Sequence, residues 1–250
     1  MSSDLLSLRA LVMSPDAGLR AHFRDAAPSS AVPLEVVEAP DATTACQCLP
    51  SGIDLAYLDA ASPPGQLGQV VAAARAAAKP PFTMQLAIGS AAPVFDADGL
   101  AGTPSRPEEA KWLLDRSIRV RLPSRVLVVD DSSTMRTIVR KTLAATRFPL
   151  DVSEADEGRA ALKLVGEEDI QIVFLDYNMQ GFNGLEMLAE FKREQPSVTV
   201  VMMTSAATDE LAEQARALGA SFLKKPFFPA DIENALSGFY GLRALNPKRA

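Results

Sequence analysis

The chain has 250 residues, 48% of them hydrophobic and 22% charged, with a net charge of -6; this excludes an intrinsically disordered chain and predicts one large or two ordinary folded domains. The acidic balance and the lack of a basic segment argue against nucleic-acid binding. No apolar run approaches the roughly 18 to 20 residues of a membrane span, so we expect no membrane insertion and a cytoplasmic protein.

The first half of the sequence alternates strand-like and helix-like segments. Short apolar runs predict four strands, at 9–13, 34–38, 53–59 and 84–88. Helix-start residues and helical spacing predict four helices: one from Ser14, two over 42–49 and 67–79, and one that begins at Pro107 and is closed by Pro123-Ser124. Residues 91–105 contain Gly and Pro with no periodicity and are predicted to be mostly loop. This half is therefore predicted to be a β-α alternation from which one helix is missing.

The second half shows a more regular alternation of five strands and five helices. Apolar runs predict strands at 125–129, 151–155, 172–176, 198–203 and 222–223. Helical spacing predicts the inward-facing residues of the helices, which are Met135, Ile138, Val139, Thr142 and Leu143, then Leu162 and Val165, then Leu185, Leu188 and Phe191, then Leu211, Ala215 and Leu218, and finally Ile232, Leu236 and Phe239. This alternation favours a parallel sheet with right-handed crossovers.

Polar side chains follow the predicted strands of this second half. Asp130 and Asp131 follow the first strand, Asp176 closes the third, and Thr204 and Lys225 follow the fourth and fifth. Because the carboxyl ends of parallel strands share one edge of the sheet, we expect these side chains to lie close together. Crowded carboxylates repel one another unless a cation lies between them, and Mg²⁺ prefers such oxygen ligands. Asp176 could then attack a phosphoryl group, with Lys225 supplying positive charge and Thr204 a hydrogen bond.

The second half contains the motif Val126-Leu127-Val128-Val129-Asp130-Asp131-Ser132-Ser133-Thr134-Met135-Arg136, followed later by Asp176, Thr204 and Lys225-Pro226. With these residues it resembles the receiver domain of two-component response regulators, in particular the chemotaxis type. The resemblance covers about residues 124–243 and implies a flavodoxin-like fold with the family's strand order 2-1-3-4-5. It also implies that Asp176 accepts a phosphoryl group from a histidine kinase.

The resemblance assigns roles to the other site residues as well. It implies that Asp131 and Asp176 ligate Mg²⁺, that Asp130 acts through a water molecule, and that Asn178 lends its backbone carbonyl. Thr204 and Lys225 would contact the phosphoryl oxygens, and Phe222 would be the aromatic side chain whose rotamer reports the position of Thr204. Three positions depart from the family pattern: Gln180 replaces Pro, Ser205 replaces Ala, and the Gly219 to Lys225 spacing is one residue short.

The first half resembles a degraded copy of the second, which predicts an internal repeat of about 117 residues. Leu58-Asp59 falls where Leu175-Asp176 falls, and Arg106-Pro107 matches Lys225-Pro226. Ser14-Pro15 replaces the acidic pair, and Gly89 or Ser90 stands near the hydroxyl position. Without paired acids Mg²⁺ should bind poorly, so we expect an interaction or dimerisation module rather than phosphorylation at Asp59.

These observations predict two tandem flavodoxin-like (βα)5 domains of the α/β class, each with a parallel five-stranded sheet. We expect a degenerate pseudo-receiver at 1–122, lacking one helix, and an active receiver at 124–245. The expected protein is a response regulator without a DNA-binding or enzymatic output domain, which catalyses only its own phosphorylation and dephosphorylation. It would signal by phosphorylation-dependent binding of a downstream protein, and its oligomeric state stays open between a monomer and a homodimer.

Three alternatives stay open from the sequence. The protein could be an adaptor whose first domain docks a partner, or a phosphate sink that drains a kinase without signalling. The third is a phosphatase of the haloacid-dehalogenase type, in which an aspartate nucleophile is followed by a second acid two residues later. Asn178 occupies that position here, which disfavours the phosphatase.

Overall fold

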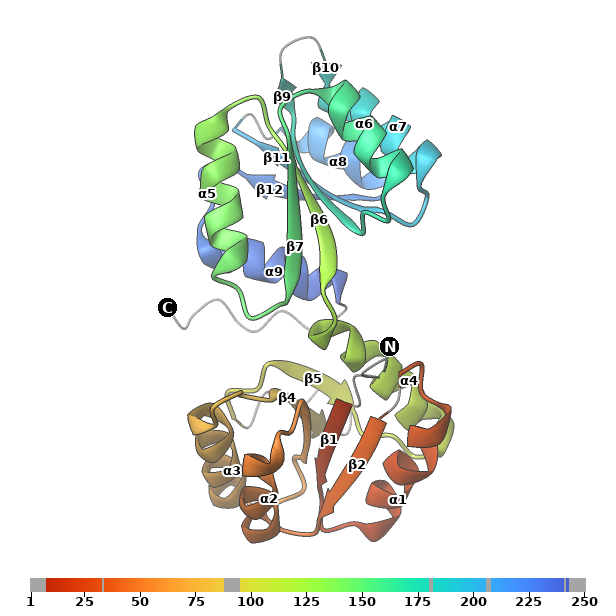
Figure 1. Ribbon diagram of the computed structural model, residues 1–250, viewed down its shortest axis with the longest axis vertical. Helices are drawn as coiled ribbons and strands as arrows, with labels where there is room; N and C mark the ends of the chain where they lie inside the picture. Colours follow the sequence, from red (N-terminus) through yellow and green to blue (C-terminus); the bar gives the residue numbers. More distant parts are fainter. Residues whose placement is uncertain are drawn as a thin grey trace, which may run out of the picture. The chain divides into compact units, whose positions relative to one another are not determined.

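The computed structural model describes residues 8–32, 34–87, 95–179, 182–205, 208–240 and 242. These residues form two compact units (Figure 1). The first unit contains the chain up to Arg121 together with Tyr240 and Leu242, and the second unit contains Leu122–Phe239. The predicted ends of the two domains, at residues 1 and 245, lie outside the described residues.

The first unit is a five-stranded parallel sheet with helices on both faces. Its strands are β1 (Leu8–Met13), β2 (Leu34–Ala39), β3 (Leu55–Asp59), β4 (Phe82–Ala87) and β5 (Gly99–Gly102). They pair in the order β2-β1-β3-β4-β5. The α-helices are α1 (Ala17–Ala26), α2 (Ala42–Cys48), α3 (Pro64–Ala76) and α4 (Pro107–Ile118). In Figure 1, α1 and α4 cover one face of the sheet and α2 and α3 cover the other.

The second unit has the same architecture. Its strands are β6 (Ser124–Val129), β7 (Leu150–Ala155), β8 (Ile172–Asp176), β11 (Thr199–Thr204) and β12 (Ala220–Lys224), paired in the order β7-β6-β8-β11-β12. Its helices are α5 (Ser133–Ala144), α6 (Gly158–Glu167), α7 (Gly184–Glu194), α8 (Asp209–Ala217) and α9 (Pro229–Phe239). A short antiparallel ribbon, β9 (Asn178–Met179) with β10 (Phe182–Asn183), precedes α7. Counted within each unit, both sheets have the strand order 2-1-3-4-5, so the predicted fold is confirmed.

Local sequence signals set where several of these helices begin and end. The side chains of Asp16, Asp41, Ser132, Asn183 and Thr208 each accept a hydrogen bond from a backbone N–H in the first turn of the helix that follows. Such caps satisfy donors that have no partner within the helix. After α8, Gly219 has a φ of 76°, a left-handed conformation that glycine adopts at little cost.

The fifth strand of the first unit was not predicted. β5 lies within residues 91–105, which the sequence predicts to be mostly loop, and it pairs with β4 over Gly99–Gly102. Its sequence is Gly-Leu-Ala-Gly, which has no β-branched or aromatic residue and therefore little strand propensity. The predicted lack of a helix before this strand agrees with residues 95–98, which are not helical, whereas residues 88–94 lie outside the described part.

Two predicted inward positions are wrong. Ile138 on α5 is 46% exposed and Leu218, just after α8, is 40% exposed. The buried residues of α5 are Val139 and Leu143, so the sheet covers a narrower stripe than the five predicted positions. Leu218 forms the C-cap of α8, where the helix has already ended.

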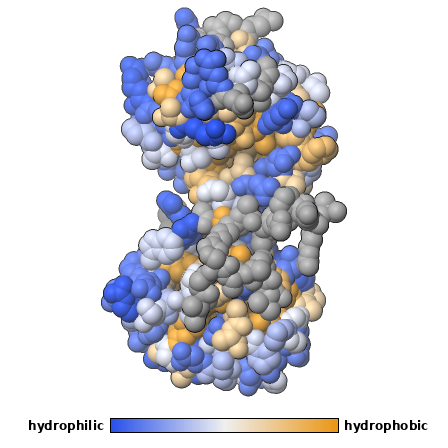
Figure 2. Space-filling model, turned by 180° about the vertical axis from the view of Figure 1, so that it is seen from behind, coloured by the Kyte–Doolittle hydropathy of each residue, from blue (hydrophilic) through white to orange (hydrophobic). Residues whose placement is uncertain are grey.

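Figure 2 shows hydrophilic side chains over much of the visible face of each unit, with hydrophobic residues interspersed. Among the helices that the structure describes, none combines the length and the apolar character needed to cross a membrane.

A buried acid lies directly before β5. Asp98 is 3% exposed. Its Oδ2 accepts hydrogen bonds from the backbone N–H of Thr83 at 2.7 Å and from the Thr83 hydroxyl at 2.8 Å. The Arg75 guanidinium, on α3, donates to both carboxylate oxygens, at 2.8 Å and 3.2 Å. A buried carboxylate needs such partners, so this polar clamp ties Asp98, the residue just before β5, to α3 and β4.

Asp98→Asn should lower the free energy of unfolding of the first unit by about 2 kcal/mol, because the amide has one acceptor oxygen and its NH2 group would face a donor of Arg75 or Thr83. Urea unfolding followed by the fluorescence of Trp112, the only tryptophan and a residue of α4, reports on this unit. Asp96→Asn is the control, because the exposed Asp96 contacts Arg75 through its backbone carbonyl. Equal urea midpoints for Asp98→Asn and the wild type would contradict the clamp.

Candidate functional site

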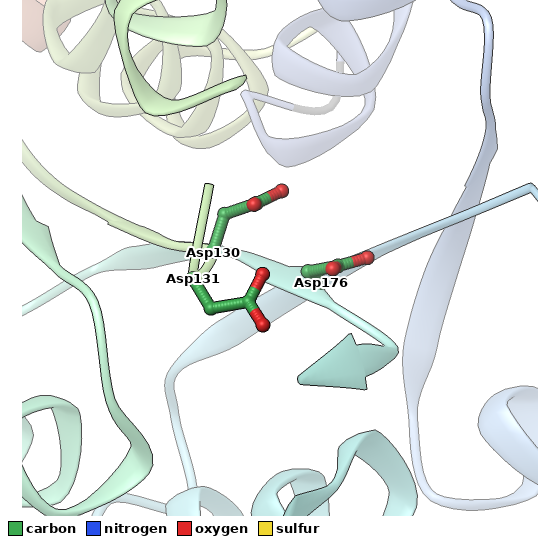
Figure 3. Close-up of side chains that lie close together, drawn as sticks. All are labelled: Asp130, Asp131 and Asp176. Atoms are coloured by element: carbon green, nitrogen blue, oxygen red, sulfur yellow. The ribbon is translucent and has the colours of Figure 1, made fainter. Parts of the chain in front are cut away.

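Three carboxylates gather at the carboxyl-terminal edge of the second sheet. Val129 on β6 pairs with Leu175 on β8, so the next residues, Asp130 and Asp176, leave neighbouring strands side by side. One carboxylate oxygen from each of Asp130, Asp131 and Asp176 lies within 4.8 Å of the other two. Figure 3 shows the three side chains together, with the Asp131 carboxylate turned toward Asp176. Asp130 and Asp176 are buried and Asp131 is exposed, so the cluster is open to solvent on one side.

The Lys225 ammonium lies between the two buried acids. Its Nζ donates to Asp130 Oδ2 at 2.9 Å and to Asp176 Oδ1 at 3.0 Å. Lys225 directly follows β12, and its backbone N–H donates to the carbonyl of Thr204 at 2.7 Å. This hydrogen bond holds Lys225 at the site although its spacing from Gly219 is one residue short. Burial lowers the pKa of Lys225, but the hydrogen bonds and charges of Asp130 and Asp176 outweigh burial and raise this pKa above its ordinary value.

The charges of the site favour a divalent cation. Three ionised carboxylates and one ammonium leave a formal charge of -2 at this edge, counting only Asp130, Asp131, Asp176 and Lys225. A dication such as Mg²⁺ would neutralise it. Hard carboxylate oxygens around a partly open position are the ligand type that Mg²⁺ prefers, since this ion keeps several of its waters. The residues present therefore fit the ion that the sequence predicts.

The structure also places the other predicted site residues. Thr204 is the last residue of β11 and is fully buried, one position beyond Met203, which pairs with Asp176. Asn178 begins β9, two residues after Asp176, and is exposed. Phe222 on β12 is partly buried and packs against the hydrophobic core of the unit. Their predicted roles stay predictions, and Gln180 lies outside the described residues.

The segment after Asp176 folds back closely on the start of α7. The backbone N–H of Gly184 donates to the carbonyl of Tyr177 at 3.2 Å. A Cβ atom at Gly184 would lie 2.7 Å from the Tyr177 Cα, so a larger residue does not fit without movement of the backbone. Gly184 therefore helps to fix the chain that leaves the Asp176 tip. The sequence analysis did not identify this residue, although the Asn183-Gly184 pair marks the turn.

Matching backbone hydrogen bonds define the equivalent site of the first unit. At the first strand tip, Ser14 donates to Ala39 as Asp130 donates to Ala155. Ala60 donates to Leu86 as Tyr177 donates to Met203, and Thr103 donates to Ala87 as Lys225 donates to Thr204. Ser14, Asp59, Ala87 and Thr103 therefore occupy the positions of Asp130, Asp176, Thr204 and Lys225.

This register corrects two predicted correspondences. Thr103-Pro104, and not Arg106-Pro107, corresponds to Lys225-Pro226, and Pro107 instead begins α4. The error follows from the missed strand β5, whose end sets the register. The hydroxyl position is taken by Ala87, not by Gly89 or Ser90, which lie outside the described residues.

In the first unit, Asp59 is hydrogen-bonded by a hydroxyl and a backbone N–H, and Thr103 stands where the second unit has the Lys225 cation. Asp59 is 6% exposed. Its Oδ2 accepts from the Ser14 hydroxyl at 2.6 Å, and its Oδ1 accepts from the backbone N–H of Ala61 at 2.9 Å. Pro15 follows Ser14 where Asp131 follows Asp130, so the positions that match the acidic pair and Asp176 hold one carboxylate where the second unit has three. Such a donor set fits a divalent cation poorly.

Comparison with known proteins finds similarity over the second unit and, for the fold, over nearly the whole chain. The family model of the response regulator receiver domain matches residues 126–237. The chemotaxis protein CheY-3 of Vibrio cholerae is 32% identical over 119 residues, which cover 46% of this chain and 91% of that protein. The chemotaxis protein CheY homolog of Campylobacter jejuni is 35% identical over 123 residues, or 47% and 92% of the two chains.

A solved structure of a probable two-component system response regulator/GGDEF domain protein covers 94% of this chain and 98% of its own, with a TM-score of 0.53 and 20% identity. At that identity the match concerns the fold alone, and it extends over both units.

Lys225→Met should destabilise the second unit by about 2 kcal/mol at pH 7, because two buried carboxylates lose their shared cation. Since the pKa of Lys225 is raised in the folded protein, its stabilisation is present in full below the unfolded value of about 10.4 and is lost as the pH rises above it. The difference between variant and wild type should therefore stay constant from pH 7 to about pH 10.4 and shrink only as the pH rises above that value.

Urea unfolding followed by circular dichroism at each pH measures this difference. Lys224→Met is the matched control, because Lys224 is the exposed neighbour of Lys225. The account of the site is contradicted if Lys225→Met is as stable as the control at pH 7, or if its deficit does not depend on pH.

Proposed function

Because the chain belongs to the response regulator receiver family, we propose that its second unit accepts a phosphoryl group on Asp176 from a histidine kinase and signals by changing which protein it binds. The observation that carries this proposal is the position of Asp176, which lies beside Asp130 and Asp131 and accepts a hydrogen bond from Lys225. We assign the pseudo-receiver to residues 1–122 and the receiver to residues 124–245.

The chemistry follows from the two oxygens of Asp176. Lys225 holds Oδ1, which leaves Oδ2 as the attacking atom. A bond forms between Oδ2 and phosphorus while the bond from phosphorus to the kinase imidazole nitrogen breaks, and the imidazole takes a proton from water. Lys225 and the Thr204 hydroxyl then contact the phosphoryl oxygens.

Asp131, Asp176 and the backbone carbonyl of Asn178 would hold Mg²⁺, with Asp130 acting through water. The ion, when bound, supplies positive charge that offsets the charge of the phosphoryl oxygens. Phe222 would report the position of Thr204 by its rotamer. Phosphorylation would shift a pre-existing equilibrium of the surface formed by β11, α8, β12 and α9, and a partner protein would bind the new surface.

The first unit is proposed to be an interaction module that takes no phosphoryl group. Ser14 and Thr103 stand at the positions of Asp130 and Lys225, so Asp59 lacks the charges that the proposed chemistry uses. A chain of this kind would catalyse only its own phosphorylation and dephosphorylation. Its output would be protein binding, without DNA-binding or other enzymatic activity.

Two alternatives within the family make different predictions. In the adaptor alternative the first unit docks the partner, so a fragment that starts at residue 124 and binds as tightly as the full chain would exclude it. In the phosphate-sink alternative, cells that carry Asp176→Asn would lose kinase drainage and no other response. The phosphatase alternative is disfavoured because Asn178 replaces its second acid.

Asp176→Asn should abolish Mg²⁺-dependent incorporation of phosphate from acetyl phosphate, because the amide cannot serve as nucleophile. Asp59→Asn is the matched variant at the equivalent position of the first unit and should leave incorporation within about twofold of the wild type. Radiolabelled phosphate on the full chain measures both. Loss of incorporation in Asp59→Asn alone would reverse the assignment of the two units.

A further inference from the structure

The turn that carries the acidic pair is tied down by an arginine of the following helix. Arg136 on α5 donates from Nη1 to the backbone carbonyl of Asp130 at 2.8 Å and to that of Asp131 at 3.4 Å. Its Nε pairs with Glu154 Oε2, on β7, at 3.2 Å, and its side chain is 15% exposed. One guanidinium therefore connects the tip of β6 to the neighbouring strand.

Backbone and side-chain hydrogen bonds complete this turn. The N–H of Ser132 donates to Asp130 Oδ1 at 2.9 Å, and the N–H of Asp130 donates to the carbonyl of Ala155 at 3.3 Å. The aim of the exposed Asp131 carboxylate depends on the backbone that carries it. Metal ligands bind well when second-layer contacts of this kind fix their direction in advance.

The same contacts recur in the first unit. Arg20 donates to the backbone carbonyl of Ser14 and pairs with Glu38 at 3.4 Å. A second arginine pairs with the same glutamate in each unit, Arg24 with Glu38 at 3.0 Å and Arg140 with Glu154 at 3.0 Å. Arg20, Arg24 and Glu38 each lie 116 positions before their counterparts, which are Arg136, Arg140 and Glu154. The contact therefore holds the strand tip in both units, but only in the second unit does that tip carry acids.

We propose that Arg136 is a positioning residue for metal binding: by holding the carbonyls of Asp130 and Asp131, it keeps both carboxylates aimed at the cluster that they form with Asp176. This inference rests on the proposed function. It predicts that removing Arg136 weakens Mg²⁺ binding, which is the opposite of what simple electrostatics predicts. Removing a cation near three carboxylates should strengthen Mg²⁺ binding by Coulomb's law, whereas loss of the positioning contact should weaken it.

Arg136→Met should raise the Kd for Mg²⁺ about tenfold, as measured by isothermal titration calorimetry of the full chain. In the metal-free protein, hydrogen exchange at the Ser132 amide should accelerate, because its acceptor on Asp130 is less well held. The rate of phosphorylation at saturating Mg²⁺ should fall by less than the affinity. A purely structural role would instead lower the unfolding temperature and leave the Kd of the folded protein unchanged.

Three further variants separate the positioning contact of Arg136 from its charge. Arg140→Met removes an arginine that pairs with the same Glu154 through Oε1, and it should leave Mg²⁺ binding unchanged or slightly tighter. Arg20→Met removes the equivalent contact of the first unit and should not change the Kd. Arg136→Lys keeps the charge without the guanidinium fork, so its Kd should lie between those of the wild type and Arg136→Met. It decides the question if Arg136→Met does not fold.

The inference is overturned if Arg136→Met, or Arg136→Lys in its place, binds Mg²⁺ as tightly as the wild type with unchanged exchange at Ser132. It is also overturned if Arg140→Met weakens binding equally. A wild-type protein that binds no Mg²⁺ would refute the proposed metal site instead, and the exchange comparison in metal-free protein would still decide whether Arg136 holds the turn.

Discussion

The ion pairs that Lys225 makes with Asp130 and Asp176 allow two acids to be buried at one edge of the second sheet. Two carboxylates, Asp130 and Asp176, are buried at neighbouring strand tips, where an uncompensated negative charge would cost several kcal/mol. Lys225 offsets that cost and, because it follows β12, it links the last strand of the sheet to β6 and β8. The same arrangement leaves net negative charge beside an exposed Asp131. One ion pair network thus stabilises the sheet edge and leaves it able to attract a cation.

The first unit retains the fold without this network. Ser14 and Thr103 stand where Asp130 and Lys225 stand, so an acid and its cation are both replaced by hydroxyl residues. Asp59 is satisfied by the Ser14 hydroxyl and a backbone N–H. The fold therefore does not require the acid cluster, and what the cluster adds to the second unit is a set of oxygen ligands that suits a divalent cation. The arginine contact to the strand tip is kept in both units, which shows that it belongs to the architecture that the site uses.

Much of the fold and the site could be predicted from the sequence because the signals are local. A buried strand such as β8 is a continuous apolar run, and an acid at its end falls on the shared edge of a parallel sheet. β5 could not be predicted, because Gly-Leu-Ala-Gly becomes a strand only through pairing with β4. Ile138 satisfies the helical period but lies beyond the stripe that the sheet covers. Arg136 contacts the backbone carbonyls of Asp130 and Asp131, and a backbone contact leaves no motif in the sequence. The sequence signal that could have found it is the repeat itself, since Arg20 and Glu38 lie 116 positions before Arg136 and Glu154.

We propose that Asp176, and no other acid of the chain, receives the phosphoryl group. This proposal can be tested by treating the full chain with acetyl phosphate and Mg²⁺, reducing any aspartyl phosphate with borohydride to homoserine, and locating the product by mass spectrometry. We expect homoserine at position 176, dependent on Mg²⁺, with unmodified aspartate at 59. Homoserine at 59, or at 176 to the same extent without Mg²⁺, would refute the assignment of Asp176.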